Sequence, residues 1–281
     1  MKLALAQLSS GEDRARNFDR VLAAMAEAAA GGAEMVVFPE IVLDRFFPQY
    51  PSPQRGVCPP AIVALAEPIP GPTTERLAVR ARELSLVTVF NLYEIDGDGR
   101  TFDSSPVIDA DGSLLGVTRM LHITDYEGFH EQDYYHPGDT GAPVYETRAG
   151  RIGVAICYDR HYPEYMRALA LAGADLVVIP QAGTLGEWPE GLFEAEIRTA
   201  AFQNGYFAAL CNRVGVEDGL TFGGESFAAD PDGRVIARGR RLEDDLVIVD
   251  LDLERCAESC GRKLFRRDRR PELYSEWVSK T

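Results

Sequence analysis

Lysine is almost missing from this 281-residue sequence, and positive charge in general is scarce. The only lysines are Lys2, Lys263 and Lys280, so the central part of the chain has no ammonium side chain. Against 29 basic residues there are 44 acidic ones, which gives a formal net charge of -15. Nucleic acid and anionic membranes are bound through clustered Lys and Arg, so both are disfavoured as partners. A small anionic substrate is not excluded, because one local arginine can bind it.

Long hydrophobic runs and paired cysteines are also missing. The first residues, MKLALAQLSS, contain a short apolar run that soon meets Gly11, Glu12 and Asp13, which fits neither a signal peptide nor a membrane span. Five cysteines, an odd number, argue against a disulfide framework. We therefore expect a cytoplasmic protein with reduced thiols. Cys256 and Cys260 have the spacing of half a metal site, but no histidine or second cysteine pair lies nearby, so we expect no metal.

What the sequence does contain is typical of a layered α/β protein. Apolar residues make up 46% of it, without a linker-like interruption, which predicts a single domain over residues 1–281. Short apolar runs alternate with amphipathic stretches. Strands are predicted at residues 3–8, 35–38, 86–92, 152–157, 176–179, 206–210 and 246–249. Helices are predicted at residues 17–30, 73–84, 162–172 and 191–204.

Two Asp-Gly pairs lie between strand-like segments. Asp111-Gly112 and Asp232-Gly233 have the residue types that tight two-residue turns require, so each predicts an antiparallel hairpin. The sheets should therefore be mixed rather than wholly parallel.

The stretch RIGVAICYDRHYPE, residues 151–164, indicates a reactive thiol. A strand is predicted to end at Cys157, and a helix to begin near Pro163. A thiol at such a turn meets backbone N–H groups and the positive end of the helix dipole, which lower its pKa and can stabilise an oxyanion. The alternative is a buried core cysteine, the commoner fate of a lone cysteine.

A carboxylate follows the predicted strand at residues 35–38. Pro39 and Glu40 come directly after it, which places Glu40 at the carboxyl edge of the sheet, where ligands bind. A glutamate buried there has a raised pKa and could accept the thiol proton. The alternative is a solvated loop carboxylate.

Taken together, these segments resemble the nitrilase (carbon-nitrogen hydrolase) superfamily. VVFPE is followed in order by HEQDYYHPGD, ICYDRHYPE, GADLVVIP, NRVGVED and DPDGRVIA, across nearly the whole chain. The resemblance implies a four-layer αββα sandwich with mixed sheets, a homodimer or larger assembly, and no metal or organic cofactor. It is closest to the branch that includes β-ureidopropionases, N-carbamoylputrescine amidases and N-carbamoyl amino acid amidohydrolases.

The same resemblance suggests substrate-binding residues. Branch members with an arginine three positions after the nucleophile use it to bind the substrate carboxylate, and Arg160 has that position. Tyr158 and His122 are further substrate-binding candidates. The alternative for Arg160 is an ion pair with Glu164, four residues on.

The family's catalytic triad is Glu-Lys-Cys, and here the sequence departs from it. TRMLHIT, residues 118–124, resembles the stretch that carries the family lysine two residues before a histidine, so Met120 has the place of the lysine. A thioether offers neither positive charge nor a hydrogen-bond donor. Losing one oxyanion donor costs about a hundredfold to a thousandfold in other hydrolases. As substitutes we consider His122, on the same strand face as Met120, and Arg119, if a bulge turns it inward.

Three other side chains are candidates for the site. Glu131 matches a glutamate that family members place beside the triad to orient the substrate or the thiol; the alternative is an exposed loop carboxylate. Trp188 and Phe193 can line the pocket, although aromatic residues at such a junction more often serve packing.

Three hypotheses of function follow. The first is a cysteine amidohydrolase that cleaves a small N-carbamoyl or amide substrate through a thioester, with Glu40 as base and Cys157 as nucleophile. The second is a non-catalytic family member that binds a carboxylate-bearing metabolite or a partner protein, which Met120 favours. The third is an introduced Lys-to-Met change in an otherwise active hydrolase, in which case lysine at position 120 restores full activity.

Overall fold

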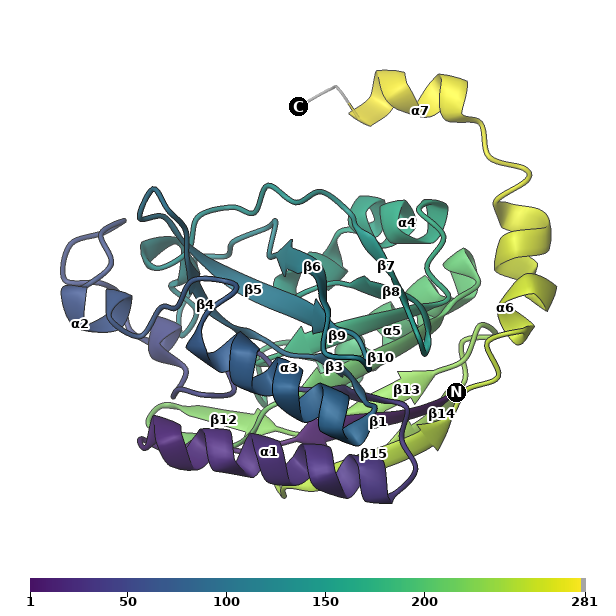
Figure 1. Ribbon diagram of the computed structural model, residues 1–281. Helices are drawn as coiled ribbons and strands as arrows, with labels where there is room; N and C mark the ends of the chain where they lie inside the picture. The colour runs from purple at the N-terminus through teal and green to yellow at the C-terminus, as the bar shows by residue number, and fades with distance from the viewer. Residues whose placement is uncertain (279–281) are drawn as a thin grey trace.

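Two mixed β-sheets form the centre of the computed structural model, which describes residues 1–278 (Figure 1). The first sheet has the order β15-β1-β2-β3-β5-β4, with β6 paired to β5. Its strands are β1 (Lys2–Gln7), β2 (Met35–Val37), β3 (Val87–Val89), β4 (Leu92–Ile95), β5 (Thr101–Ile108), β6 (Leu114–Arg119) and β15 (Asp245–Asp250).

The second sheet has the order β14-β13-β10-β9-β8-β7. Its strands are β7 (Val144–Thr147), β8 (Gly150–Val154), β9 (Leu176–Gln181), β10 (Phe207–Asn212), β13 (Phe227–Ala229) and β14 (Val235–Arg238). A separate hairpin pairs β11 (Val214–Glu217) with β12 (Leu220–Gly223).

Longer helices cover the outer faces of the two sheets. The helices are α1 (Arg14–Ala30), α2 (Pro60–Val63), α3 (Pro72–Leu84), α4 (Pro163–Leu171), α5 (Leu192–Asn204), α6 (Arg255–Glu258) and α7 (Pro271–Val278). Helices α1 and α3 lie side by side against the first sheet, and α4 and α5 pack against the second (Figure 1).

The alternation of side chains along each strand explains the four layers. In β1, Ala4 packs against α1 and α3, whereas Leu3 joins the core between the sheets. In β9, Val177 packs against α4 and α5, whereas Leu176 faces the same central core. Both faces of each sheet are therefore buried, and the expected αββα sandwich with mixed sheets is confirmed.

Both predicted hairpins are present. Strands β5 and β6 are antiparallel around Asp111-Gly112, and β13 and β14 are antiparallel around Asp232-Gly233. The second residue of each turn has a positive φ, 85° at Gly112 and 75° at Gly233, which glycine adopts without strain.

Two predicted strands differ from the structure. The single strand expected at residues 86–92 is divided into β3 and β4, because Asn91 uses its side chain to bind Ile41, Asp103 and Ser105. The strand expected to reach Cys157 ends earlier, at Val154, because the last residues turn toward the site.

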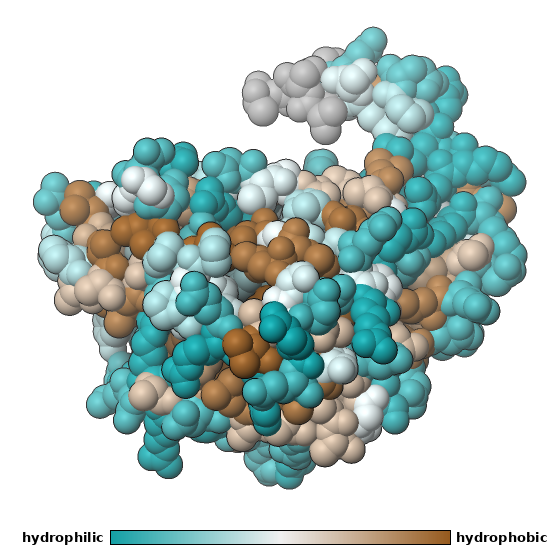
Figure 2. All heavy atoms as spheres, in the orientation of Figure 1, coloured by the Kyte–Doolittle hydropathy of each residue, from teal (hydrophilic) through white to brown (hydrophobic). Residues whose placement is uncertain are grey.

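The C-terminal segment leaves the sandwich. Helix α7 stands away from the body of the protein, and its surface is mostly polar (Figures 1 and 2). Trp277 on this helix is 58% exposed, and Leu273 is exposed as well. No helix within residues 1–278 is both long enough and apolar enough to cross a membrane.

Candidate active site

Cys157 begins a short 3-10 turn, Cys157–His161, between β8 and helix α4. Its φ of 43° lies in the left-handed region, which is strained for a residue with a side chain and is often found at functional sites. Only 5% of the residue is exposed, and its side chain lies in the apolar core between the two sheets. Pro163 then starts α4, as predicted.

Glu40 lies in the loop after β2 and is completely buried. The next residue, Ile41, also has a positive φ of 44°, so this loop is held in a strained form. Arg213 holds it: its Nη1 donates to the carbonyl oxygen of Glu40 at 2.9 Å and to that of Ile41 at 2.5 Å. Arg213 is itself buried in an ion pair with Glu217.

Two more buried carboxyl groups lie beside Glu40. Asp103, on β5, accepts a hydrogen bond from Asn91 at 2.5 Å, and Glu131 accepts one from the backbone of Thr124 at 3.5 Å. Both are fully buried, so the alternative of an exposed loop carboxylate at position 131 is wrong, as it is at position 40.

Most oxygens of this acid cluster, Glu40, Asp103 and Glu131, have no hydrogen-bond donor. Both Glu40 oxygens, one Asp103 oxygen and one Glu131 oxygen are buried and unpartnered. The Cys157 thiol and the Asp103 carboxyl lie beside Glu40 without making a bond of good geometry. The hydroxyl of Tyr135 is likewise buried and unpartnered, close enough for all three carboxyl groups to affect it.

Burial and like charge raise the pKa of every acid in this cluster. The pKa of Glu40 rises to about 8, first because of burial and then because of the charge of Glu131. The pKa values of Asp103 and Glu131 also rise, again chiefly through burial. Burial and the charge of Glu40 raise the pKa of the Cys157 thiol, while Arg160 opposes them. The expectation of a lowered thiol pKa is therefore wrong, because burial and the charge of Glu40 outweigh the opposing charge of Arg160.

Met120 follows β6 and packs in the same core as Cys157. Its backbone N–H donates to the Asp103 carbonyl oxygen at 2.9 Å. Asp159, in the Cys157 turn, accepts hydrogen bonds from the next two backbone N–H groups, those of Leu121 and His122. The position expected for the family lysine is thus tied to the Cys157 turn through Asp159, but its side chain carries no charge.

The side chains of both neighbours already have partners in the structure. The Arg119 guanidinium binds Glu94 and Asp139 and stacks on the Phe102 ring at 3.9 Å, so the hypothesis that Arg119 turns inward is wrong. His122 directs Nδ1 to Asp159 at 2.6 Å and stacks on Tyr162, so this nitrogen is engaged away from Glu40.

The distant lysines do not replace the family lysine either. Lys263 pairs with Glu258 on the C-terminal segment, and Lys2 lies in β1 near Gly32. Lys280 lies outside the described residues.

Arg160 lies in the Cys157 turn and is buried. Its Nη1 donates to the Cys157 carbonyl oxygen at 2.8 Å and to Gln181 Oε1 at 3.0 Å. Its ion pair, at 3.5 Å, is with Glu196 on α5, so the alternative of a pairing with Glu164 is wrong. The reason is that α4 begins only at Pro163, and Arg160 precedes it on the other side of the turn. The Nη2 atom has no partner.

A cavity of about 590 Å³ lies beside Arg160. Gln181, Trp188 and Phe193 line it, and the Arg160 guanidinium stacks on the Phe193 ring at 4.5 Å. Gln181 Nε2 and Trp188 Nε1 are buried donors without partners. Tyr158 lies nearby and packs against His161, which in turn contacts Trp188.

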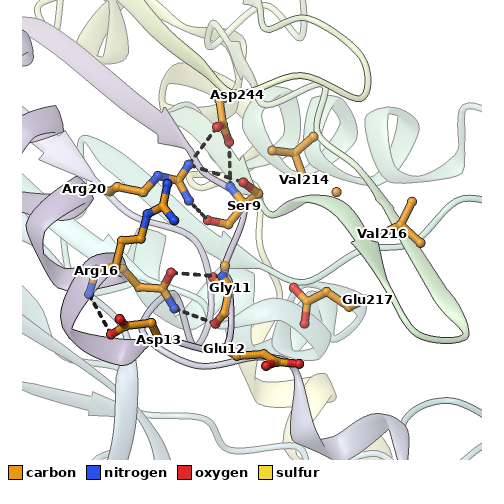
Figure 3. Close-up of a pocket in the computed structure, with 13 residues that line it drawn as sticks. Ser9, Gly11, Glu12, Asp13, Arg16, Arg20, Val214, Val216, Glu217 and Asp244 are labelled. Carbon is orange, nitrogen blue, oxygen red and sulfur yellow. Dashed lines mark hydrogen bonds and ion pairs between the residues drawn. The ribbon is translucent and has the colours of Figure 1, made fainter.

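A larger cavity, of about 800 Å³, lies at the start of α1 (Figure 3). None of the predicted site residues lines it. Its polar groups already bind one another: Arg20 donates to Asp244 at 2.7 Å and to Ser9 (Figure 3). The Asn17 side chain accepts a hydrogen bond from the Gly11 backbone N–H at 2.9 Å. The hydroxyls of the cavity's two serines, Ser9 and Ser10, contact Arg20 and the Val42 carbonyl oxygen rather than a base, so the Cys157 region is the candidate active site.

Three residues of this site were not predicted from the sequence. Asp103 lies within β5, Gln181 ends β9 and Arg213 lies between β10 and β11, and nothing in the local pattern separates them from solvated polar residues. The available signal was the NRVGVED motif for Arg213. Within residues 1–278, no group of three His, Cys, Asp or Glu side chains is arranged to hold a metal ion.

Comparison with known proteins agrees with the sequence resemblance. The sequence model described as carbon-nitrogen hydrolase matches residues 2–259. A citrullinase from Francisella tularensis subsp. tularensis (strain SCHU S4 / Schu 4) is 30% identical over 100% of this chain and 99% of its own length. An N-carbamoylputrescine amidase from Arabidopsis thaliana is 31% identical over 95% of this chain and 92% of its own. The crystal structure of a carbon-nitrogen hydrolase from Helicobacter pylori G27 superposes with a TM-score of 0.91 at 28% identity, covering 100% of this chain and 99% of that one.

Proposed function

Because the chain belongs to the carbon-nitrogen hydrolase family, we propose that it cleaves a C–N bond of a small N-carbamoyl or amide substrate, with Cys157 as the nucleophile. The observation that carries this proposal is the buried Glu40 carboxyl group beside the Cys157 thiol, each on a strained turn. A base beside a nucleophile is the arrangement that covalent catalysis requires.

The reaction proceeds in two halves. Glu40 accepts the Cys157 proton, the thiolate attacks the carbonyl carbon, and the amine or ammonia leaves with the proton that Glu40 held. Water then attacks the thioester, with Glu40 again as the base. Glu131 orients the substrate or the thiol, and backbone N–H groups of the Cys157 turn stabilise the oxyanion. With Met120 in place of lysine, the oxyanion receives no ionic partner.

Unpartnered donors support a substrate that carries a carboxylate. Arg160 Nη2 and Gln181 Nε2 are both buried and without partners; Gln181 lines the cavity, and Arg160 donates to Gln181 from the Cys157 turn. A carboxylate bound there would satisfy both donors, with the planar guanidinium making the stronger contact. Tyr158 and His122 remain candidates for contacts with the substrate.

The test is ammonia release by the purified protein on a panel of N-carbamoyl amino acids, N-carbamoyl amines and simple amides. We expect turnover of a carboxylate-bearing member that is lost in Cys157→Ala and in Glu40→Gln. Cys211→Ala serves as the control, because Cys211 is also a buried thiol but its Sγ binds the Val37 carbonyl oxygen. Turnover that survives Cys157→Ala contradicts the proposal.

A second candidate function rests on Met120. A family member without the lysine could bind a carboxylate-bearing metabolite or a partner protein and leave it unchanged. This candidate is favoured if neither the natural protein nor Met120→Lys releases ammonia from any panel substrate while a panel member binds tightly. If the natural protein releases no ammonia but Met120→Lys does, the protein is a hydrolase that position 120 alone inactivates.

We also propose a homodimer or larger assembly. Helix α7 stands away from the body and exposes Trp277 and Leu273, which a second copy of the chain would bury (Figure 1).

A further inference from the structure

Among the buried polar atoms without partners, two groups near the site have opposite character. Around Cys157 they are acceptors, from Glu40, Asp103 and Glu131. Beside the cavity they are donors, namely Arg160 Nη2, Gln181 Nε2 and Trp188 Nε1. Unpaired buried groups are costly, so a bound molecule that pairs with both groups gains the most.

A neutral amide or ureido group does not fit the acceptor group well. Its carbonyl oxygen becomes negative in the tetrahedral intermediate, and that charge would develop beside the buried acids Glu40 and Glu131. Met120 offers no donor to offset it. The Tyr135 hydroxyl, buried among the acids, is one neutral donor and carries no charge.

An amidinium or guanidinium group fits better. It is planar, carries one positive charge, and presents several N–H donors that match carboxylates in pairs. Attack by a thiolate on its central carbon gives a neutral tetrahedral intermediate, so no oxyanion forms. The positive charge that lysine would supply is then carried by the substrate itself.

We infer that this site also hydrolyses the C–N bond of an amidinium or guanidinium group in a substrate whose other end is a carboxylate. The reacting group lies among Glu40, Asp103 and Glu131, and the carboxylate lies on Arg160. This inference rests on the proposed function in one respect, namely that Cys157 is the nucleophile.

The reaction balances with water as the only co-reactant. Glu40 accepts the Sγ proton, the Sγ–C bond forms, and the C=N electrons move to nitrogen. The C–N bond then breaks, and ammonia leaves with the proton from Glu40, which leaves a cationic carbon bonded to Sγ. Water adds to that carbon and gives a proton to Glu40. The C–S bond breaks, Sγ regains its proton, and the hydroxyl proton leaves with ammonia as ammonium, so a guanidino acid becomes a ureido acid.

The experiment compares matched pairs of substrates: guanidinoacetate with ureidoacetate, 3-guanidinopropionate with 3-ureidopropionate, and 4-guanidinobutyrate with 4-ureidobutyrate. Ammonia release gives kcat/KM for the natural protein, Met120→Lys, Met120→Leu and Cys157→Ala. We expect the natural protein to favour the guanidino member of its best pair by about tenfold or more, because a cation stabilises the ionised form of the clustered carboxyl groups, which burial otherwise disfavours. Met120→Lys should reverse the order, Met120→Leu should keep it, and Cys157→Ala should abolish both activities.

A second measurement does not depend on turnover. Iodoacetamide alkylation of Cys157 in the natural protein should be slowed by the guanidino acid at concentrations at which the ureido acid has no effect. The inference is overturned if the natural protein prefers the ureido substrate, or if neither guanidino turnover nor guanidino protection is found. If the inference fails but the protein still hydrolyses a ureido substrate in a reaction that requires Cys157, the proposed function holds. If the protein is inactive on every substrate and is not alkylated at Cys157, both the inference and the proposed function are contradicted.

Discussion

Glu40 is the side chain whose protonation decides most of the chemistry. Its pKa is raised to about 8 by burial and by the charge of Glu131, while Asp103, Cys157 and Arg213 act in the opposite direction. A general base is most effective when its pKa lies near the working pH. We therefore expect kcat/KM of a Cys157-dependent reaction to rise with pH through about 8, as measured on any panel substrate that is turned over. A flat profile across this range would show that another group is the base.

The same raised pKa makes the stability of the folded protein depend on pH. Between the ordinary value of 4.5 and about 8, the folded protein keeps a proton on Glu40 that the unfolded chain releases. The contribution of Glu40 to stability is complete below pH 4.5 and is lost as the pH rises through about 8. Glutamine does not ionise, so Glu40→Gln removes this loss of stability. The difference in free energy of unfolding between the variant and the natural protein should therefore be larger at about pH 8.5 than at about pH 5, by on the order of 2 to 4 kcal/mol. Urea unfolding at both pH values measures the gain, and an unchanged pH slope would falsify the assignment to Glu40.

Position 120 controls the reactivity of the thiol. A lysine there adds a positive charge beside the acids, which favours the thiolate and lowers the pKa of Cys157. We expect iodoacetamide to alkylate Met120→Lys about tenfold or more faster than the natural protein near neutral pH, since one pKa unit is a tenfold change in thiolate. Met120→Leu controls for packing and should leave the rate unchanged. Equal rates for the lysine and leucine variants would mean that the side chain at 120 does not face the thiol.

At the scale of elements, the site depends on two strained turns that distant segments hold in place. Arg213, after β10, fixes the Glu40 turn through two carbonyl oxygens and pairs with Glu217. Asp159 ties the Cys157 turn to the residues after Met120. A strained turn persists only where several contacts with the surrounding structure hold it in place.

Removal of Arg213 should therefore damage both the fold and the site. Arg213→Met leaves Glu217 as a buried unpaired charge, and we expect the free energy of unfolding to fall by about 3 to 5 kcal/mol. Arg234→Met is the matched control, because the Arg234 side chain is 74% exposed and should change stability by less than about 0.5 kcal/mol. Chemical denaturation compares the two variants, and similar losses would argue against a special role for the buried arginine.

The elements that the sequence predicted well are those whose apolar residues follow one period. All four predicted helices agree with the structure within three residues at each end, and the strands of the two sheet centres were found. The Asp111-Gly112 turn predicted a strand before it, but the bounds of β5 (Thr101–Ile108) were not predicted because the strand is polar: Asp103, Ser104 and Ser105 are completely buried there. Their partners include Asn91 and Glu94 on another part of the chain, and no local pattern contains those contacts.

The site shows the same division. Glu40, Met120, Glu131, Cys157 and Arg160 could be identified because motifs with a fixed order mark them. Asp103 had no motif, although its contact with Glu40 lowers the pKa of Glu40 while the charge of Glu131 raises it. Asp103 lies beside Glu40 only because β5 packs against the Glu40 turn. This packing brings together residues more than sixty positions apart, which no local sequence pattern reveals.

For the whole molecule, the site exists only where the two sheets meet. Glu40 follows β2 and Met120 follows β6 in the first sheet, whereas Cys157 follows β8 and Gln181 ends β9 in the second. The apolar core between the sheets includes Met120 and Cys157 themselves. Any change in how the sheets pack therefore alters the distance between base and nucleophile, so assembly and activity are expected to be linked.

The assembly of the protein can be tested at its C-terminal segment. Helix α7 leaves Trp277 58% exposed at a distance from the body, and an isolated helix of this length gains little stability by itself (Figure 1). A second copy that buries Trp277 and Leu273 would stabilise it. We expect the natural protein to elute as a dimer or larger species in size-exclusion chromatography with light scattering, and Trp277→Asp combined with Leu273→Asp to shift it to a smaller mass. Val79→Asp is the control, because Val79 is 54% exposed on α3 and should leave the mass unchanged. A natural protein that is monomeric at all concentrations would exclude this role for α7, and a shift in the control variant would show that the effect is not specific to the C-terminal helix.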